Sequence, residues 1–371
     1  MQVIFIITLF VLLSFFITEP ELIFSASQNA IKLWANTVVP SMLPFFILNH
    51  LLKTTGGISL IGRCFRRPVE KFLKLPGEAA FILASGYCTG VPVSAALIAD
   101  LRQKEVLSQK EANRLLAYGS NVSPAFLLSA VSIAMLGSES TGPLLAAVHY
   151  GSNLLLMVVT CFYIKPKDRF ISPPKGDDPL PPFSMDMLSE AIFQSLRTIF
   201  LIGGIILCFF ILITAVNASD LIGRIAAICN LSDKGEMILD GLICGTLEIT
   251  AGASCISAAP LSFSLRCSLL SAVLAFGGLS ALMQIASVIR HTDLSLGFYL
   301  KYKIIQGVLA FAISLLFPVF PEEATAVISR GFAHTTPSAL YMPQGIYLYL
   351  IMVALALILI IYRRLCGKRK R

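Results

Sequence analysis

The chain has 371 residues, of which 56% are hydrophobic and 13% are charged, with a formal net charge of +8. A soluble domain carries about 25% charged residues, so this composition excludes a water-soluble enzyme and indicates an integral membrane protein. The basic residues lie in short loops and in the tail RRLCGKRKR at residues 363–371. In these positions they set the orientation in the membrane, and no nucleic-acid partner is expected.

Apolar stretches follow one another along the chain, and most reach the roughly 17–25 residues of a spanning helix. They cover residues 3–18, 33–52, 79–99, 115–136, 143–164, 191–216, 236–260, 265–289, 304–320 and 346–362. The first has no basic residues before it and is predicted to be a retained spanning helix rather than a cleaved signal. The longest polar connection, residues 165–190, is rich in proline and charge and is predicted to be a linker.

The stretch FILASGYCTGVPVSAALIAD, residues 81–100, is long enough to cross a bilayer, yet glycines and a proline interrupt its middle. Basic loops at residues 53–78 and 100–114 flank it, and by the positive-inside rule both are cytoplasmic. The stretch must then enter and leave on the same side, as a re-entrant hairpin over residues 79–99. Because non-helical backbone at membrane depth is tolerated only where protein or water surrounds it, we expect the bend to line a cavity.

The second half of the chain echoes the first. The tripeptide IGR at residues 61–63 recurs at 222–224, and AYG at 117–119 has the counterpart AFG at 275–277, in the same order. A second glycine-rich hairpin is predicted over residues 236–260. The predicted topology starts one unit outside and the other inside, so the repeats are inverted, and paired interruptions of this kind indicate a transporter binding site.

We therefore predict an all-α polytopic membrane protein with about eight transmembrane helices and two re-entrant hairpins in an inverted repeat. In chain order its parts are an N-terminal transmembrane helix and external loop (1–32), a first repeat (33–136), a transmembrane helix and cytoplasmic linker (137–190), a second inverted repeat (191–289), and two C-terminal transmembrane helices with a basic cytoplasmic tail (290–371).

Glu248 lies in the middle of the second hairpin, within GTLEITAG, together with Thr250 and Gly252. An unpaired charge at membrane depth costs at least about 2.5 kcal/mol on insertion scales, and intramembrane acids usually have a function. One interpretation is a proton or cation site or a group that binds substrate, and H⁺ or Na⁺ is then the coupling ion. The alternative is a structural carboxyl that accepts hydrogen bonds from backbone N–H groups of the hairpin.

The first hairpin supplies candidate substrate-binding residues Ser85, Gly86, Tyr87, Thr89 and Gly90. If both hairpins meet near the midplane, the free N–H groups at their half-helix N-termini favour an anionic ligand. Close packing between membrane helices also uses glycine and serine, so a purely structural interpretation stays open.

Two further segments carry polar residues at membrane depth. AYGSNVSPAFL places Asn121 and Ser123 beside a proline, which predicts an unwound turn whose carbonyl groups are free for a ligand. His149 and Asn153 are four residues apart and share one face of a helix, where they could relay protons with Glu248 or bond to a neighbouring helix.

The chain contains no Walker loop, dinucleotide fingerprint, HExxH or GxSxG motif and no CxxC pair. No catalytic residues, resident cofactor or metal site are therefore predicted, and the protein is not expected to be an enzyme.

Several segments together resemble the YlbJ family of sporulation integral membrane proteins, over nearly the whole chain. They are SGYCTG at 85–90, ADLRQKEVLSQKEANRLL at 99–116, SNVSP at 120–124, HYGSN at 149–153 and TLEITAG at 246–252. The resemblance implies a nucleoside-recognition or gate membrane domain, found also in concentrative nucleoside transporters and ferrous-iron permeases. It further implies a role in endospore formation, moving dipicolinic acid from the mother cell across the outer forespore membrane.

We predict a sporulation-associated secondary transporter of a small anionic solute, by resemblance dipicolinic acid, that works by alternating access. Two alternatives stay open: a non-transporting scaffold for sporulation, and a transporter of a nucleoside-type solute. The expected partners are the solute and the lipid bilayer, with self-association or other sporulation membrane proteins left open. The expected location is the cell membrane or the outer forespore membrane, with multiple passes and both termini cytoplasmic.

Overall fold

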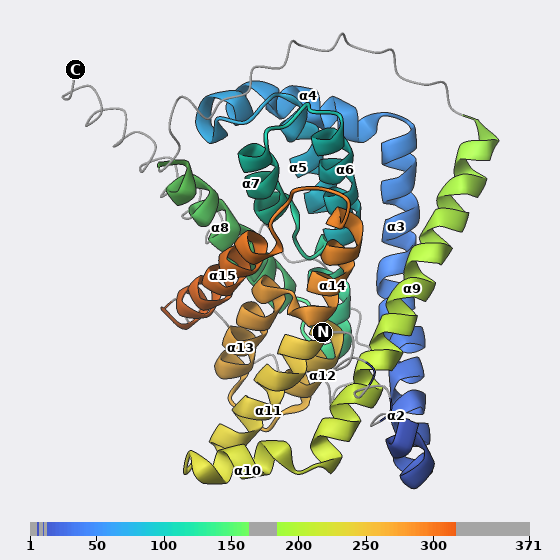
Figure 1. Ribbon diagram of the computed structural model, residues 1–371, viewed down its shortest axis with the longest axis vertical. Helices are drawn as coiled ribbons and strands as arrows, with labels where there is room; N and C mark the ends of the chain where they lie inside the picture. The colour runs from blue at the N-terminus through green and yellow to red at the C-terminus, as the bar shows by residue number, and fades with distance from the viewer. Residues whose placement is uncertain (1–5, 7–9, 11–12, 163–183, 317–371) are drawn as a thin grey trace, which may run out of the picture.

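The computed structural model describes residues 6, 10, 13–162 and 184–316. Over these residues the secondary structure is helical, without strands (Figure 1). Within them, five helices are long and apolar enough to cross a membrane, which confirms the prediction of an all-α polytopic membrane protein. These spans are Pro20–Thr54, Thr141–Cys161, Met185–Ala218, Phe263–Ile289 and Leu296–Leu316.

The difference from the predicted number of about eight spans has two causes. The apolar stretch at residues 115–136 is divided between an α-helix that ends at Gly119 and a π-helix that begins at Phe126, so neither piece is long enough to span. The predicted span at 346–362, and most of the one at 3–18, lie outside the described residues.

The first half of the chain contains mostly short helices that are separated by turns or by π-helical segments. Its elements are α2 (Pro20–Leu33), η1 (Trp34–Val38), α3 (Val39–Thr54), α4 (Gly57–Pro68), η2 (Val69–Leu73), α5 (Glu78–Thr89), α6 (Val91–Gln103), α7 (Gln109–Gly119) and η3 (Phe126–Met135). Helix α8 (Thr141–Phe162) follows. The second half contains α9 (Met185–Ala218), α10 (Leu221–Ile228), α11 (Asp233–Leu247), α12 (Ile249–Ala258), α13 (Phe263–Phe276), α14 (Gly278–Ile289) and α15 (Leu296–Leu316).

The segment expected as an external loop, residues 19–32, is instead helical. Pro20 stands in the first turn of α2, where a missing backbone N–H does no harm, and the helix then continues without a break into η1 and α3. Ile23, Ala26 and Ala30 recur at helical spacing and are buried on one face. Two charged residues in fourteen were too few to exclude a membrane-embedded helix here.

The two halves have the same order of elements. Each has a long helix (α3, α9), a short helix (α4, α10), a broken hairpin (α5–α6, α11–α12) and an interrupted helix (α7–η3, α13–α14). In Figure 1, α4 lies at one end of the molecule and α10 at the opposite end. The shared order and these opposite positions are those expected of an inverted repeat, which stays a prediction.

Helix α9 packs along the continuous helix formed by α2, η1 and α3. The indole nitrogen of Trp34 donates a hydrogen bond to the carbonyl oxygen of Ile199 at 2.9 Å. A Cβ atom at Gly203 would lie 2.7 Å from that nitrogen, so the glycine makes room for the ring. These two long helices form one wall beside the hairpins (Figure 1).

A cluster of polar contacts joins the end of α6 to the connection between α14 and α15. Arg102 forms a bidentate ion pair with Asp293, with both N···O distances 2.9 Å. Gln109 donates to the backbone carbonyl of Asp293 at 2.6 Å, and Asn113 accepts from the backbone N–H of Ser295 at 2.7 Å. The first half is thereby linked to the second through a contact outside the spanning helices.

We expect this contact to stabilise the protein in a manner that depends on pH and salt. The Arg102 guanidinium lowers the pKa of the Asp293 carboxyl. The ion pair therefore stabilises the folded protein fully above the ordinary pKa of an aspartate, and this stabilisation is lost as pH falls through the lowered pKa of Asp293. Both side chains are partly exposed, so a double-mutant cycle with Arg102→Gln and Asp293→Asn should give a coupling of about 0.5–1 kcal/mol at neutral pH. Thermal unfolding in detergent measures it.

The matched control for that cycle is the exposed pair Lys104–Asp100, which lies within α6 and its C-terminal turn and joins no distant segments. It should show weaker coupling. A coupling between Arg102 and Asp293 that is zero, or that persists unchanged at about 1 M salt, would contradict the expectation.

Candidate functional site

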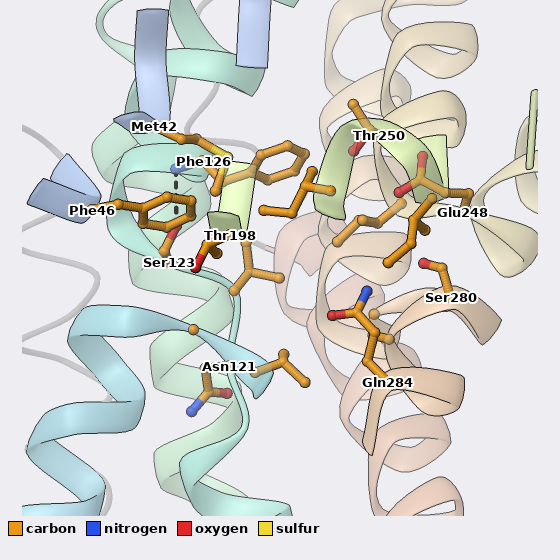
Figure 2. Close-up of a pocket in the computed structure, with 18 residues that line it drawn as sticks. Met42, Phe46, Asn121, Ser123, Phe126, Thr198, Glu248, Thr250, Ser280 and Gln284 are labelled. Carbon is orange, nitrogen blue, oxygen red and sulfur yellow. Dashed lines mark hydrogen bonds between the residues drawn. The ribbon is translucent and has the colours of Figure 1, made fainter. Parts of the chain in front are cut away.

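A cavity of about 120 Å³ lies where the hairpin tips and the helix interruptions of both halves meet (Figure 2). Side chains of α3 and α9 complete its wall. From the first half it is lined by Met42, Phe46, Gly90, Val91, Asn121, Val122, Ser123 and Phe126, and from the second half by Thr198, Ile202, Ile205, Glu248, Ile249, Thr250, Gly277, Ser280, Ala281 and Gln284. The volume is below the roughly 300–1,000 Å³ of pockets for drug-sized ligands, which suits a small solute.

Gly90 forms the tip of the first hairpin. Its φ of 86° and ψ of −172° lie in a region that is open essentially to glycine alone, so the residue permits the reversal between α5 and α6. Helix α6 begins directly after it, and no side chain caps its N-terminus. Val91, in the first turn of α6, lines the cavity beside Gly90.

Glu248 forms the tip of the second hairpin. Its extended backbone separates α11 from α12, and its Oε2 accepts a hydrogen bond from the backbone N–H of Ala251 at 2.6 Å. The carboxyl therefore caps the N-terminus of α12, which is the contact of the structural interpretation. Glu248 also lines the cavity together with Thr250, and it is 3% exposed (Figure 2). The Glu248 carboxyl thus both caps helix α12 and lines the cavity.

The two interrupted helices supply amides and hydroxyls to the cavity. After α7 ends, Asn121 donates to the Tyr118 carbonyl at 2.7 Å, and Ser123 Oγ accepts from the Phe126 N–H at 3.4 Å. The counterpart break in the second half is at Gly277, whose φ of 89° is left-handed. Ser280 and Gln284 follow it on α14 and face Asn121 across the cavity in Figure 2.

The structure brings some of the predicted site residues together and separates others. Those that line the cavity are Gly90, Asn121, Ser123, Glu248 and Thr250. Gly86 and Gly252 lie at helix crossings instead: a Cβ atom at Gly86 would collide with the carbonyl oxygen of Gly119, and one at Gly252 with the backbone of Gly245. These two glycines permit close approach of backbones, which is the packing interpretation that the sequence left open.

Two other candidates of the first hairpin, Ser85 and Tyr87, lie away from the cavity lining. Ser85 is fully buried in α5. Tyr87 contacts α8, since its hydroxyl accepts a hydrogen bond from Asn153 Nδ2 at 2.8 Å. Thr89 is the last residue of α5, and its side chain lies outside the part of the chain that the structure describes.

His149 and Asn153 lie on α8, behind the segment that lines the cavity. Asn153 Nδ2 also donates to the Tyr118 carbonyl at 2.9 Å, and its Oδ1 accepts from the Tyr302 hydroxyl at 2.9 Å. His149 Nε2 accepts from the backbone N–H of Val122 at 3.3 Å. In the described residues no hydrogen bond connects either of them to Glu248, so the predicted relay remains a prediction.

Sequence reasoning missed several residues of the site. Thr198 contributes a hydroxyl from the middle of an apolar helix, while Met42 and Phe46 contribute apolar surface. Lys303 directly precedes the predicted apolar stretch at residues 304–320, yet it lies inside α15 and is 2% exposed. A signal for it exists, because Tyr299, Lys303 and Gln306 recur at helical spacing on one face.

The cavity combines one acid with neutral hydrogen-bonding groups and an apolar wall. Hydroxyls and amides can orient a small polar molecule, and the apolar side chains can contact a ring. Among the described residues no group of three or more His, Cys, Asp or Glu side chains is arranged to hold a metal ion.

No family model and no solved structure matches the chain. A curated protein does: the sporulation integral membrane protein YlbJ of Bacillus subtilis (strain 168) is 28% identical over 324 residues, which cover 81% of this chain and 78% of the relative. The match includes most of the hairpins and interrupted helices described above. Together with the multi-pass helical fold, this similarity supports assignment of the chain to the YlbJ family of sporulation integral membrane proteins.

Proposed function

We propose that the protein is a secondary transporter that moves a small anionic solute, dipicolinic acid, across a membrane of a sporulating cell by alternating access. The observation that carries this proposal is the cavity at which two broken hairpins and two interrupted helices meet. Broken helices in an inverted repeat are how many secondary transporters build a binding site near the bilayer midplane.

The lining of the cavity supports a small anion with an apolar ring. Helices α6 and α14 both begin at the cavity without a side-chain cap, and helix N-termini carry partial positive charge. Phe46, Phe126 and Met42 offer apolar contacts to a ring. Dipicolinate is an aromatic dicarboxylate and has both of these properties.

In this proposal Glu248 couples transport to H⁺ or Na⁺, because it is the acid of the cavity wall. The protein lies in the outer forespore membrane or the cell membrane with both termini in the cytoplasm. It acts without enzymatic chemistry, either alone or with other membrane proteins of sporulation.

Uptake of labelled dipicolinate into vesicles that contain the purified protein tests the proposal. Gly90→Leu should reduce uptake at least about tenfold, because leucine is strained at the left-handed φ and extends toward the cavity. The matched control is Gly204→Leu on α9, where an added Cβ meets no atom within 4 Å and uptake should be unchanged.

The possible results separate the competing functions. Normal uptake by Gly90→Leu would remove the cavity from the pathway. Uptake of uridine in place of dipicolinate by the wild type would favour a nucleoside-type transporter. Vesicles that take up neither solute would favour a scaffold, and deletion of the protein should then disturb the assembly of other spore-membrane proteins.

A further inference from the structure

The side chain of Lys303 is enclosed between α15, α8 and the segment that follows α7. It is 2% exposed, and its ammonium donates to Gln306 Oε1 at 2.8 Å and to Asn121 Oδ1 at 3.4 Å. Its nitrogen also lies 5.8 Å from the centre of the Tyr299 ring. All of these partners are neutral.

No carboxylate oxygen of the described residues lies within 4 Å of the Lys303 nitrogen. Nearby His149 is not a counter-charge either. Its Nε2 accepts a hydrogen bond from Val122, so this ring is a neutral imidazole. A buried ammonium without an opposite charge is unfavourable, which makes the position informative.

The chain segment 121–123, which lines the cavity, also contacts Lys303. Asn121 lines the cavity and accepts from Lys303 with the same side chain, while Val122 lines the cavity and donates to His149. Glu248 lies on the opposite wall, where the N-terminus of α12 already compensates its carboxyl. The acid in the cavity wall and the cation behind it therefore differ: the Glu248 carboxyl accepts a hydrogen bond at a helix N-terminus, whereas the Lys303 ammonium has only neutral hydrogen-bond partners.

We propose that Lys303 is the fixed counter-charge for a carboxylate of the transported solute, acting through Asn121, and that it makes the cavity selective for carboxylates over neutral analogues. This inference rests on the transport function proposed above. A bound carboxylate beside Asn121 supplies the negative charge that the protein omits. If the solute itself carries the opposite charge, Lys303 needs no carboxylate of the protein beside it.

The selectivity ratio between two probes tests this role. We would measure binding of dipicolinate and of its neutral diamide, pyridine-2,6-dicarboxamide, to purified protein in detergent by isothermal titration. The wild type should prefer the dicarboxylate by at least about tenfold, and Lys303→Met, which keeps length and apolar volume, should bring the ratio close to one. Lys303→Arg should keep a preference, and Lys301→Met, at an exposed position of α15, should match the wild type.

A second variant changes the charge without touching the lysine. Asn121→Asp gives Lys303 an internal carboxylate, although it gives up the hydrogen bond to the Tyr118 carbonyl, so it should also remove the preference for dicarboxylate. A Lys303→Met protein that keeps the wild-type ratio overturns the inference and leaves the transport proposal standing. Equal loss of both probes shows a merely structural lysine, and a wild type that binds neither probe contradicts the proposed function and this role together.

Discussion

Glu248→Gln is expected to keep wild-type stability and lose most transport, whereas Glu248→Ala is expected to lose transport and part of the stability. The carboxyl caps α12 through Ala251 and also lines the cavity. A glutamine retains an oxygen that can accept from the Ala251 N–H but can no longer bind or release a proton. An alanine removes the cap as well, which should lower the free energy of unfolding by about 0.5–2 kcal/mol.

Thermal unfolding and dipicolinate uptake, measured on the same preparations at several pH and sodium values, distinguish these effects. Uptake by Glu248→Gln should fall at least about tenfold and lose its dependence on the coupling ion. Glu236→Gln, at an exposed acid of α11, is the matched control. If Glu248→Gln transported normally at every pH and sodium level, the carboxyl would be a helix cap with no part in coupling.

Gly252→Ala is expected to be among the most destabilising single substitutions in the second hairpin. The added methyl group would collide with the backbone of Gly245, and its next neighbour is the Cys244 carbonyl carbon at 3.1 Å. Overpacking costs about 1–3 kcal/mol where side chains can shift, and here the obstacle is backbone. We expect a loss of at least about 3 kcal/mol and a Tm lower by at least about 5 °C.

Gly204→Ala is the matched control, because a methyl group there meets no atom within 4 Å. It should unfold at or slightly above the wild-type temperature, since alanine favours helix. Gly86→Ala in the first hairpin should behave as Gly252→Ala does, because its methyl group meets the Gly119 carbonyl. Wild-type unfolding of both hairpin variants would mean that α5 and α12 are not packed this closely in the membrane.

The breaks in the hairpins could be predicted from the sequence because their causes are local. Glycine next to Val91-Pro92 and an acid within an apolar stretch both disfavour a continuous membrane helix, so Gly90 and Glu248 were recognisable as tips. Asn121 and Ser123 were recognisable for the same reason, since they stand in a proline-containing turn. All four line the cavity.

The remaining assignments depend on contacts between distant segments. Gly86 and Gly90 are the same residue type four positions apart, and only the backbone angles and the neighbouring Gly119 distinguish a packing glycine from a turn glycine. Lys303 has the sequence signature of a helix end at a membrane surface. The helical spacing of Tyr299, Lys303 and Gln306 places them on one face of α15, but the segments that bury this face, α8 and the residues after α7, are distant in sequence.

In the proposed alternating access, the shared order of elements in the two halves bears on how access to the cavity is exchanged between the two sides of the membrane. The two halves contain the same elements. Each half could therefore adopt the conformation that the other half has in this structure. Exchanging the two arrangements would reverse which face is open without unfolding any helix. The energy difference between the two states then comes from the positions at which the halves differ, so the contrast between Gly90 and Glu248 at equivalent tips would bias the resting orientation.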